Sequence, residues 1–198
     1  MTPLSQSILE FMSPRPEGSP LRAKELLHLG ERAAVDQALS RLHRRGKLLR
    51  VGRGIYALPI EGRFGARAPS PSQLVKELSR ATGETITSHG AAAANALGLT
   101  TQVPVKSQYL TSGRNRRMAV GGQTVELRHA PPWQLHNAND RAGEVVRALS
   151  WLGKTEAPRA LATLRSRLSA AELQTLVESR ANLPTWMARE ISTLMSDV

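Results

Sequence analysis

A group of polar side chains at helical spacing is well suited to bind a ligand through hydrogen bonds. Gln37, Ser40, Arg41 and Arg44 fall at positions i, i+3, i+4 and i+7, so a helix would present them together on one face. Each of these side chains can hydrogen-bond a base edge or a phosphate oxygen. The spacing therefore predicts a helix face able to contact nucleic acid.

A short basic turn follows this stretch. Two apolar runs, residues 48–51 and 55–58, flank Gly52-Arg53-Gly54. An arginine between two glycines predicts a tight hairpin tip that can approach a sugar-phosphate backbone closely. The candidate DNA-contacting residues, including those near the helix ends, are Arg32, Gln37, Ser40, Arg41, Arg44, Arg45 and Arg53.

An apolar stripe must position the candidate helix. Within residues 31–45 the stripe consists of Val35, Ala38, Leu39 and Leu42. Gly46 is expected to end the helix, because glycine adopts the left-handed capping conformation without steric strain.

Two further helices are expected before this one. The pattern predicts helices over residues 5–12 and 21–29, with a turn at Gly30. Arg22 and Lys24, near the start of the second, could touch phosphate or be solvated. Helix, turn, helix and basic hairpin together predict a winged helix-turn-helix domain over residues 1–67.

A segment rich in proline and glycine, residues 59–71, predicts the domain boundary, so the second domain covers residues 68–198. Alternating helical and β-prone runs predict a small α+β unit there, with a hairpin at Gly121-Gly122, and helices fill the rest of the chain. The expected helices cover residues 73–81, 88–97, 139–152, 157–168, 169–179 and 184–194, and the expected strands cover 84–87, 105–110, 117–120 and 124–129. The fold class is α+β: an N-terminal winged helix-turn-helix, a small α+β unit and a C-terminal helical bundle.

The charge of the chain is concentrated in its first part. The net charge is +11, and residues 13–67 hold 12 Lys and Arg against 5 Asp and Glu, whereas residues 139–198 hold 8 against 7. This asymmetry favours a polyanion-binding module followed by a part that meets a different partner. Aromatic residues are only 4%, which argues against a base-stacking RNA-binding platform.

No catalytic constellation is apparent. There is no cysteine, and the five histidines lack metal-ligand spacing. Phosphate-binding and nucleophile-elbow glycine motifs are absent. A Mg²⁺-dependent nuclease would favour Glu-x-Lys, but the sequence offers only Glu61-x-Arg63, Glu126-x-Arg128 and Glu178-x-Arg180. We therefore expect no enzyme activity, no cofactor and no metal site.

Arg114, Arg116 and Arg117 form a second basic cluster at the start of the expected hairpin. The cluster is either a solvated loop or a contact to phosphate or to a partner surface.

The hydropathy pattern favours a cytoplasmic protein. No apolar run approaches the ~18 residues of a membrane span, and the first residues do not resemble a signal peptide.

Several segments resemble one known family, the AbiEi-type antitoxins of type IV toxin–antitoxin (abortive infection) systems, which act in phage defence. The segments that carry the resemblance are residues 32–42 (RAAVDQALSRL), 52–56 (GRGIY), 90–99 with 101–104 (TQVP), 106–113 (KSQYLTSG) with Arg116-Arg117, and 148–154 (ALSWLGK).

The resemblance implies a bifunctional protein. In that family the winged helix binds inverted repeats in its own promoter and represses transcription, and the remainder neutralises a nucleotidyltransferase-like toxin. Gln37, Arg41, Arg44 and Arg53 would then contact double-stranded DNA, and the part beyond Ser70 would carry the antitoxin activity. Binding as a dimer or as two monomers on adjacent half-sites stays open.

Two other hypotheses remain. The chain could be a plain winged-helix transcriptional regulator whose C-terminal domain dimerises or binds a ligand. It could also be an RNA-binding or nuclease-associated protein, although the scarcity of aromatic residues argues against this third reading.

Overall fold

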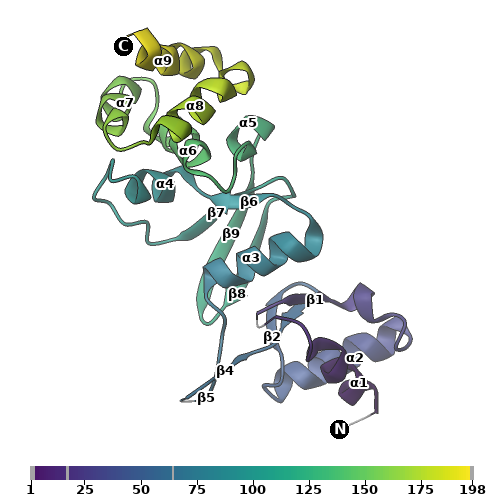
Figure 1. Ribbon diagram of the computed structural model, residues 1–198. Helices are drawn as coiled ribbons and strands as arrows, with labels where there is room; N and C mark the ends of the chain where they lie inside the picture. Colours follow the sequence, from purple (N-terminus) through teal and green to yellow (C-terminus); the bar gives the residue numbers. More distant parts are fainter. Residues whose placement is uncertain (1–2, 17, 64, 197–198) are drawn as a thin grey trace. The chain divides into compact units, whose positions relative to one another are not determined.

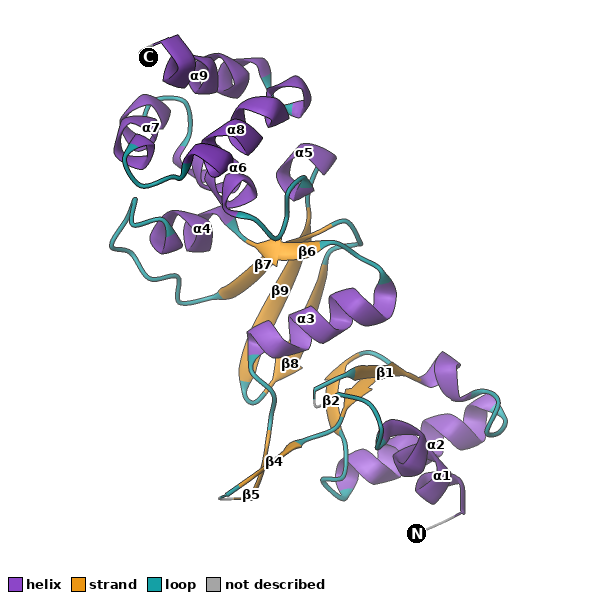
Figure 2. Cartoon of the chain, in the orientation of Figure 1, coloured by secondary structure: helices purple, strands orange, loops and turns teal. Residues whose placement is uncertain are grey.

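The protein is a mixed α+β chain that divides into two compact units (Figure 1). The computed structural model describes residues 3–16, 18–63 and 65–196. One unit comprises Met1–Glu84 and Arg116–Glu126, and the other comprises Thr85–Asn115 and Leu127–Val198. Helices and strands occur in both units (Figure 2), which confirms the predicted α+β class.

The first unit has the element order of a winged helix. Its three-stranded antiparallel sheet has the order β1-β3-β2, with Leu21 opposite Tyr56 and Leu49 opposite Ala57. Its elements are α1 (Pro3–Met12), β1 (Pro20–Arg22), the 3₁₀ turn η1 (Ala23–Leu26), α2 (Arg32–Arg44), β2 (Leu49–Gly52), β3 (Ile55–Ala57), β4 (Ile60–Gly62), β5 (Gly65–Arg67), α3 (Pro71–Thr82) and β8 (Arg116–Val120).

Helix α2 follows the apolar pattern of its sequence. Val35, Ala38, Leu39 and Leu42 are at most 2% exposed and join a core with residues of α1, β1, η1 and β3. The helix ends where Gly46 adopts φ +69° and the N–H of the next residue donates to Leu42 O at 2.9 Å. The predicted helix and its glycine stop are confirmed.

The predicted helix over residues 21–29 is wrong. Leu21 and Arg22 lie in β1, where they pair with Tyr56 and Ile55 of β3. Only η1 remains helical, and it begins where the Arg22 N–H donates to Glu25 Oε1 at 3.0 Å. The strand pairing satisfies backbone groups of Leu21 and buries its side chain completely, so non-local contacts override the local helical pattern.

The predicted boundary between residues 67 and 68 differs from the observed division. The proline- and glycine-rich segment contains the antiparallel hairpin β4–β5, apart from Phe64, which lies outside the described residues. Helix α3 begins with Ser70 as its N-cap and belongs to the first unit. It contacts β1, and Ser19 Oγ donates to Glu77 Oε2 at 3.5 Å.

The second unit combines short strands with a cluster of helices. Its strands β6 (Ile86–Ser88) and β7 (Ser107–Thr111) pair antiparallel. The remaining elements are α4 (Gly90–Ala96), β9 (Gln123–His129, whose residues 123–126 belong to the first unit), α5 (Pro132–Leu135), α6 (Arg141–Leu152), α7 (Ala157–Arg165), α8 (Ala170–Glu178), the 3₁₀ turn η2 (Ser179–Asn182) and α9 (Thr185–Ser196). In the part of the chain that the structure describes, no helix combines the length and the apolar character that a membrane crossing requires.

Local signals beyond α3 match the observed turns and caps. Gly121 and Gly122 both have positive φ in the turn between β8 and β9. Asp140 caps α6, and Ser169 and Glu172 form the expected capping box of α8. His89 caps α4 by accepting the Ala91 N–H at Nδ1, and burial together with the charge of Arg128 lowers the pKa of His89, which favours the neutral ring that this cap needs.

Helices α4 and α6 approach closely at Gly90. A Cβ atom at Gly90 would lie 2.5 Å from the backbone oxygen of Arg147 and 2.6 Å from Cβ of Trp151. The absence of a side chain at this position therefore permits the packing of α4 on α6.

Replacing Gly90 by alanine tests this close approach. Helix propensity alone would favour alanine by about 1 kcal/mol, but the clash with α6 backbone should instead destabilise the unit by about 1–3 kcal/mol. Ala92→Gly, at a half-buried position of the same helix, is the matched control and should lose only about 1 kcal/mol. Thermal unfolding measures both variants, and a Gly90→Ala variant as stable as the wild type would contradict the close packing.

Candidate nucleic-acid interface

The structure brings together the polar residues predicted on α2. Gln37, Ser40, Arg41 and Arg44 are all exposed, on the side of the helix opposite its buried stripe. Arg41 Nη2 lies 3.4 Å from Gln37 Oε1, so these two side chains are neighbours one turn apart. The exposed face of α2 therefore presents hydrogen-bond donors and acceptors side by side, as base recognition requires.

The two arginines at the ends of α2 differ in their surroundings. Arg32 Nε pairs with Asp36 Oδ2 at 2.8 Å, and both side chains are about half exposed. Arg45, the C-cap residue, is exposed. Among the residues that the structure describes, no carboxylate forms an ion pair with Arg44 or Arg45.

The hairpin between β2 and β3 carries Arg53 at its tip. Arg53 is exposed, and Gly54 has φ +68°, a conformation that favours glycine. The Ala23 N–H donates to Gly54 O at 3.3 Å, so the tip is attached to η1. The basic hairpin predicted from Gly52-Arg53-Gly54 is thus present and held in place.

A basic hollow connects this tip to the start of α2. Its volume is about 330 Å³, and Arg22, Lys24, Arg32 and Arg53 line it together with Ala23, Gly54 and Ile55. Four cations and no carboxylate contribute to this lining. The hollow is therefore suited to an anion such as a phosphate group.

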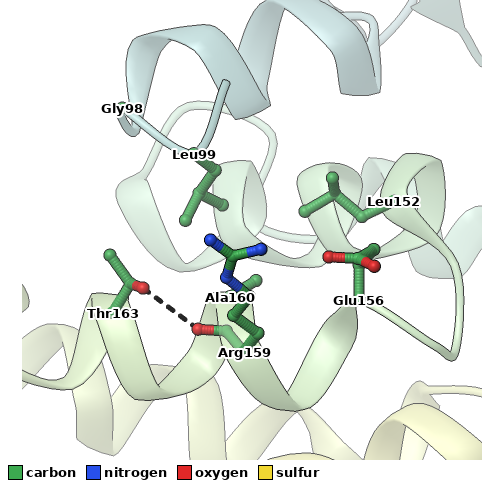
Figure 3. Close-up of a pocket in the computed structure, with 7 residues that line it drawn as sticks. All are labelled: Gly98, Leu99, Leu152, Glu156, Arg159, Ala160 and Thr163. Atoms are coloured by element: carbon green, nitrogen blue, oxygen red, sulfur yellow. Dashed lines mark hydrogen bonds between the residues drawn. The ribbon is translucent and has the colours of Figure 1, made fainter. Parts of the chain in front are cut away.

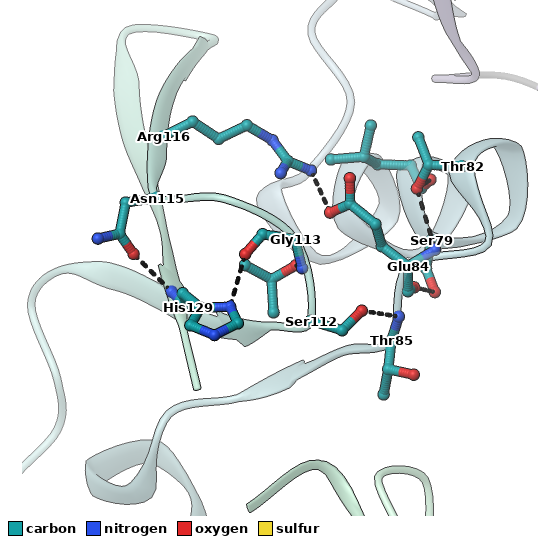
Figure 4. Close-up of polar contacts among 11 residues, drawn as sticks. Ser79, Thr82, Glu84, Thr85, Ser112, Gly113, Asn115, Arg116 and His129 are labelled. Carbon is teal, nitrogen blue, oxygen red and sulfur yellow. Dashed lines mark hydrogen bonds and ion pairs between the residues drawn. The ribbon is translucent and has the colours of Figure 1, made fainter. Parts of the chain in front are cut away.

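The fold places the three arginines of the second predicted cluster in different surroundings, and Figure 4 shows the pairing of one of them, Arg116, with Glu84. Arg116 is mostly buried, and its Nη2 pairs with Glu84 Oε2 at 2.7 Å. Arg117 is 78% exposed, and its Nε pairs with Glu126 Oε1 at 3.0 Å. Arg114 is exposed in the loop before β8 and belongs to the second unit. Arg116 thus has a structural contact, whereas Arg117 is accessible to a ligand.

The loop that carries Arg114 is held by local hydrogen bonds. Asn115 Oδ1 accepts the His129 N–H at 2.6 Å, and His129 Nδ1 lies 2.9 Å from Gly113 O (Figure 4). The Thr85 N–H donates to Ser112 Oγ at 3.0 Å. His129 and Asn115 therefore stabilise the conformation of this loop.

The second unit contains a small hollow of about 250 Å³ (Figure 3). Arg159 and Glu156 supply its charged groups, and Thr163 Oγ1 donates to the backbone oxygen of Arg159 at 3.0 Å. The remaining lining residues are Gly98, Leu99, Leu152 and Ala160. Across the described ranges, no three His, Asp or Glu side chains come together in a way that could hold a metal ion.

Arg50 is a basic residue of the candidate interface that is missing from the DNA-contacting residues predicted from the sequence. It is exposed on β2, between half-buried Leu49 and buried Val51. Strict alternation along the strand, counted back from Val51, could have indicated that Arg50 faces outward.

Comparisons with known proteins place the chain in a family. A family model described as "Family of unknown function (DUF6088)" matches residues 7–165. The chain belongs to the DUF6088 family. The match runs from within α1 to the end of α7, so it includes the whole candidate interface. No match was found among curated proteins.

One solved structure of another protein is similar to this member of the DUF6088 family. The crystal structure of the Rv2827c protein from Mycobacterium tuberculosis matches it with a TM-score of 0.52 and 16% sequence identity. The match covers 98% of this chain and 76% of that chain. At this level of identity the similarity demonstrates a shared fold.

The different surroundings of Arg116 and Arg117 predict different effects on stability. Arg116→Gln removes the charge-assisted bond to Glu84 and should lower the free energy of unfolding by about 1–2 kcal/mol. Arg117→Gln removes a pair in which Glu126 is 15% exposed but Arg117 is 78% exposed; because water solvates the exposed guanidinium, the loss should be smaller, about 0.5 kcal/mol. Urea unfolding of both variants measures the difference. Equal losses would show that the fold does not separate the two arginines.

Proposed function

We propose that this protein is a DNA-binding autorepressor and antitoxin of a type IV toxin–antitoxin system. The observation that carries the DNA-binding part is the exposed polar face of α2, which lies in the same unit as the Arg53 hairpin. A major groove is wide enough to admit a helix, and the side chains of this face match the donors and acceptors of base edges and phosphates.

The proposed binding mode assigns different tasks to the two basic elements. Arg41 and Arg44 on α2 contact base edges or nearby phosphates in the major groove. Arg53 contacts the backbone beside it, and the hollow with Arg22 and Lys24 receives a phosphate. Inverted repeats in the promoter would bind two copies of the chain, one on each half-site.

The antitoxin part of the proposal rests on the resemblance to AbiEi-type antitoxins and on the charge distribution. Residues 139–198 are nearly neutral, with 8 basic and 7 acidic side chains, which suits a protein partner better than DNA. The partner is a nucleotidyltransferase-like toxin, and the protein acts in the cytoplasm, where both the toxin and the promoter are found.

Substitutions on α2 test the DNA-binding part. Arg41→Ala and Arg44→Ala should each weaken binding to the protein's own promoter by about 1–3 kcal/mol where the side chain reads a base, with a smaller effect on unrelated duplex DNA. Lys76→Ala is the control, because Lys76 is exposed on α3 in the same unit and lies outside the candidate interface. Fluorescence anisotropy measures the affinities. Unchanged promoter binding by both variants would exclude α2 as the reading helix.

A growth assay tests the antitoxin part. The neighbouring open reading frame is induced alone, with the full chain, and with the full chain carrying both Arg41→Ala and Arg44→Ala. We expect the wild type and the double variant to relieve toxicity equally, because the substitutions affect only the DNA-binding face. A harmless neighbour, or toxicity that the full chain does not relieve, would favour a plain transcriptional regulator.

A further inference from the structure

Strand β8 lies alongside β2 within the first unit, although the two strands are far apart in the sequence. A hollow of about 560 Å³ lies between the hairpin β8–β9 and the β2–β3 hairpin. Arg50, Arg53 and Arg117 contribute its charged side chains, and Val51, Gly52, Met118, Ala119 and Thr124 complete the lining. The fold therefore gathers three arginines from two distant parts of the chain.

The base of this hollow is buried while its arginines are accessible. Val51 of β2 and Met118 of β8 are 1% and 2% exposed, so both strands are anchored in the interior. Arg50 and Arg117 occupy the adjacent outward positions, and Arg117 is 78% exposed. A ligand can reach these guanidinium groups without first displacing the core.

The electrostatics of the hollow favour an anion. Arginine stays charged at any physiological pH, so the guanidinium groups repel one another unless an anion lies between them. No carboxylate lines the hollow; the nearby Glu126 is 15% exposed and pairs with Nε of Arg117 at 3.0 Å. The Nη groups of Arg117 carry four further N–H donors, which can orient toward phosphate while Glu126 steadies the side chain.

Arg53 makes this hollow continuous with the proposed DNA-binding surface. It lines both this hollow and the smaller one that contains Arg22, Lys24 and Arg32. The two hollows thus share the Arg53 side chain at the hairpin tip. A duplex bound to α2 and Arg53 would bring a further backbone phosphate within the reach of the second hollow.

We propose that Arg50 and Arg117 bind the phosphate backbone of double-stranded DNA next to Arg53, so that β8 is part of the DNA-binding surface. This inference rests on the proposed DNA-binding function and extends it to a segment beyond residue 67. The contact is independent of base sequence, because phosphates position the protein without specifying bases. The DNA-binding unit is therefore discontinuous in the sequence.

The test uses the full chain with Arg50→Gln, Arg117→Gln and both substitutions together. Affinities for the promoter duplex and for an unrelated duplex of equal length are measured over a range of salt concentrations. Each substitution should reduce the slope of log K against log salt by about 0.9, the value for one phosphate contact, and the double variant by about twice that. The ratio of promoter to unrelated affinity should stay unchanged. Lys76→Gln, outside the hollow, should leave the slope as in the wild type.

Other outcomes identify which proposal fails. If the wild type binds its promoter and the double variant keeps the same slope, the arginines of the hollow are solvated and this inference alone is overturned. If the double variant keeps its DNA affinity but loses toxin neutralisation, the hollow meets the protein partner and the inference is equally overturned. If the wild type binds neither duplex, the proposed DNA-binding function fails together with it. Circular dichroism of each variant verifies that the fold is intact.

Discussion

Burial of one face of α2 is the interaction on which the candidate interface depends. Leu39 and Leu42 are fully buried, and each contributes about 1.5–3 kcal/mol by leaving water. A helix that buries one stripe must expose the opposite one, so the packing of these leucines determines the direction in which Arg41 and Arg44 point. The polar face takes no part in the core. Its residues can therefore be chosen for recognition without loss of stability, which is the usual division of labour on an amphipathic helix.

Pairing between β1 and β3 places the second part of the interface. Because Leu21 lies opposite Tyr56, the chain that follows β1 starts its turn beside the hairpin tip. The bond from Ala23 N–H to Gly54 O then connects the two segments. Arg22, Lys24 and Arg53 converge on one hollow as a result. The same strand pairing that prevents a helix over residues 21–29 thus brings these cations to one hollow.

The sequence predicts the features that are determined by neighbouring residues. The stripe of α2, the stop at Gly46, the hairpin turn at Gly121 and Gly122 and the capping box at Ser169 each depend on a few consecutive positions, and the structure contains all of them. The features that it does not predict depend on distant partners. Leu21 becomes a strand residue only because β3 is available, α3 joins the first unit through contacts with β1, and β8 comes to lie beside β2. No periodicity within either strand indicates such a neighbour, so Arg50 could not be grouped with Arg117 before the fold was known.

Adjacent basic residues need not share a function, and Arg116 and Arg117 illustrate why. Successive side chains of a strand point to opposite faces, so one arginine turns toward Glu84 and the other toward solvent. Arg116 is itself mostly buried, so it would have to leave Glu84 before it could bind phosphate. Arg117 is exposed and can offer its Nη groups to a phosphate while Nε keeps its bond to Glu126. Counting charges along the sequence therefore overestimates how many arginines of this cluster can reach a ligand. The arginines that matter for recognition are those that the fold leaves accessible and brings close to other cations, because only these gain from an added polyanion.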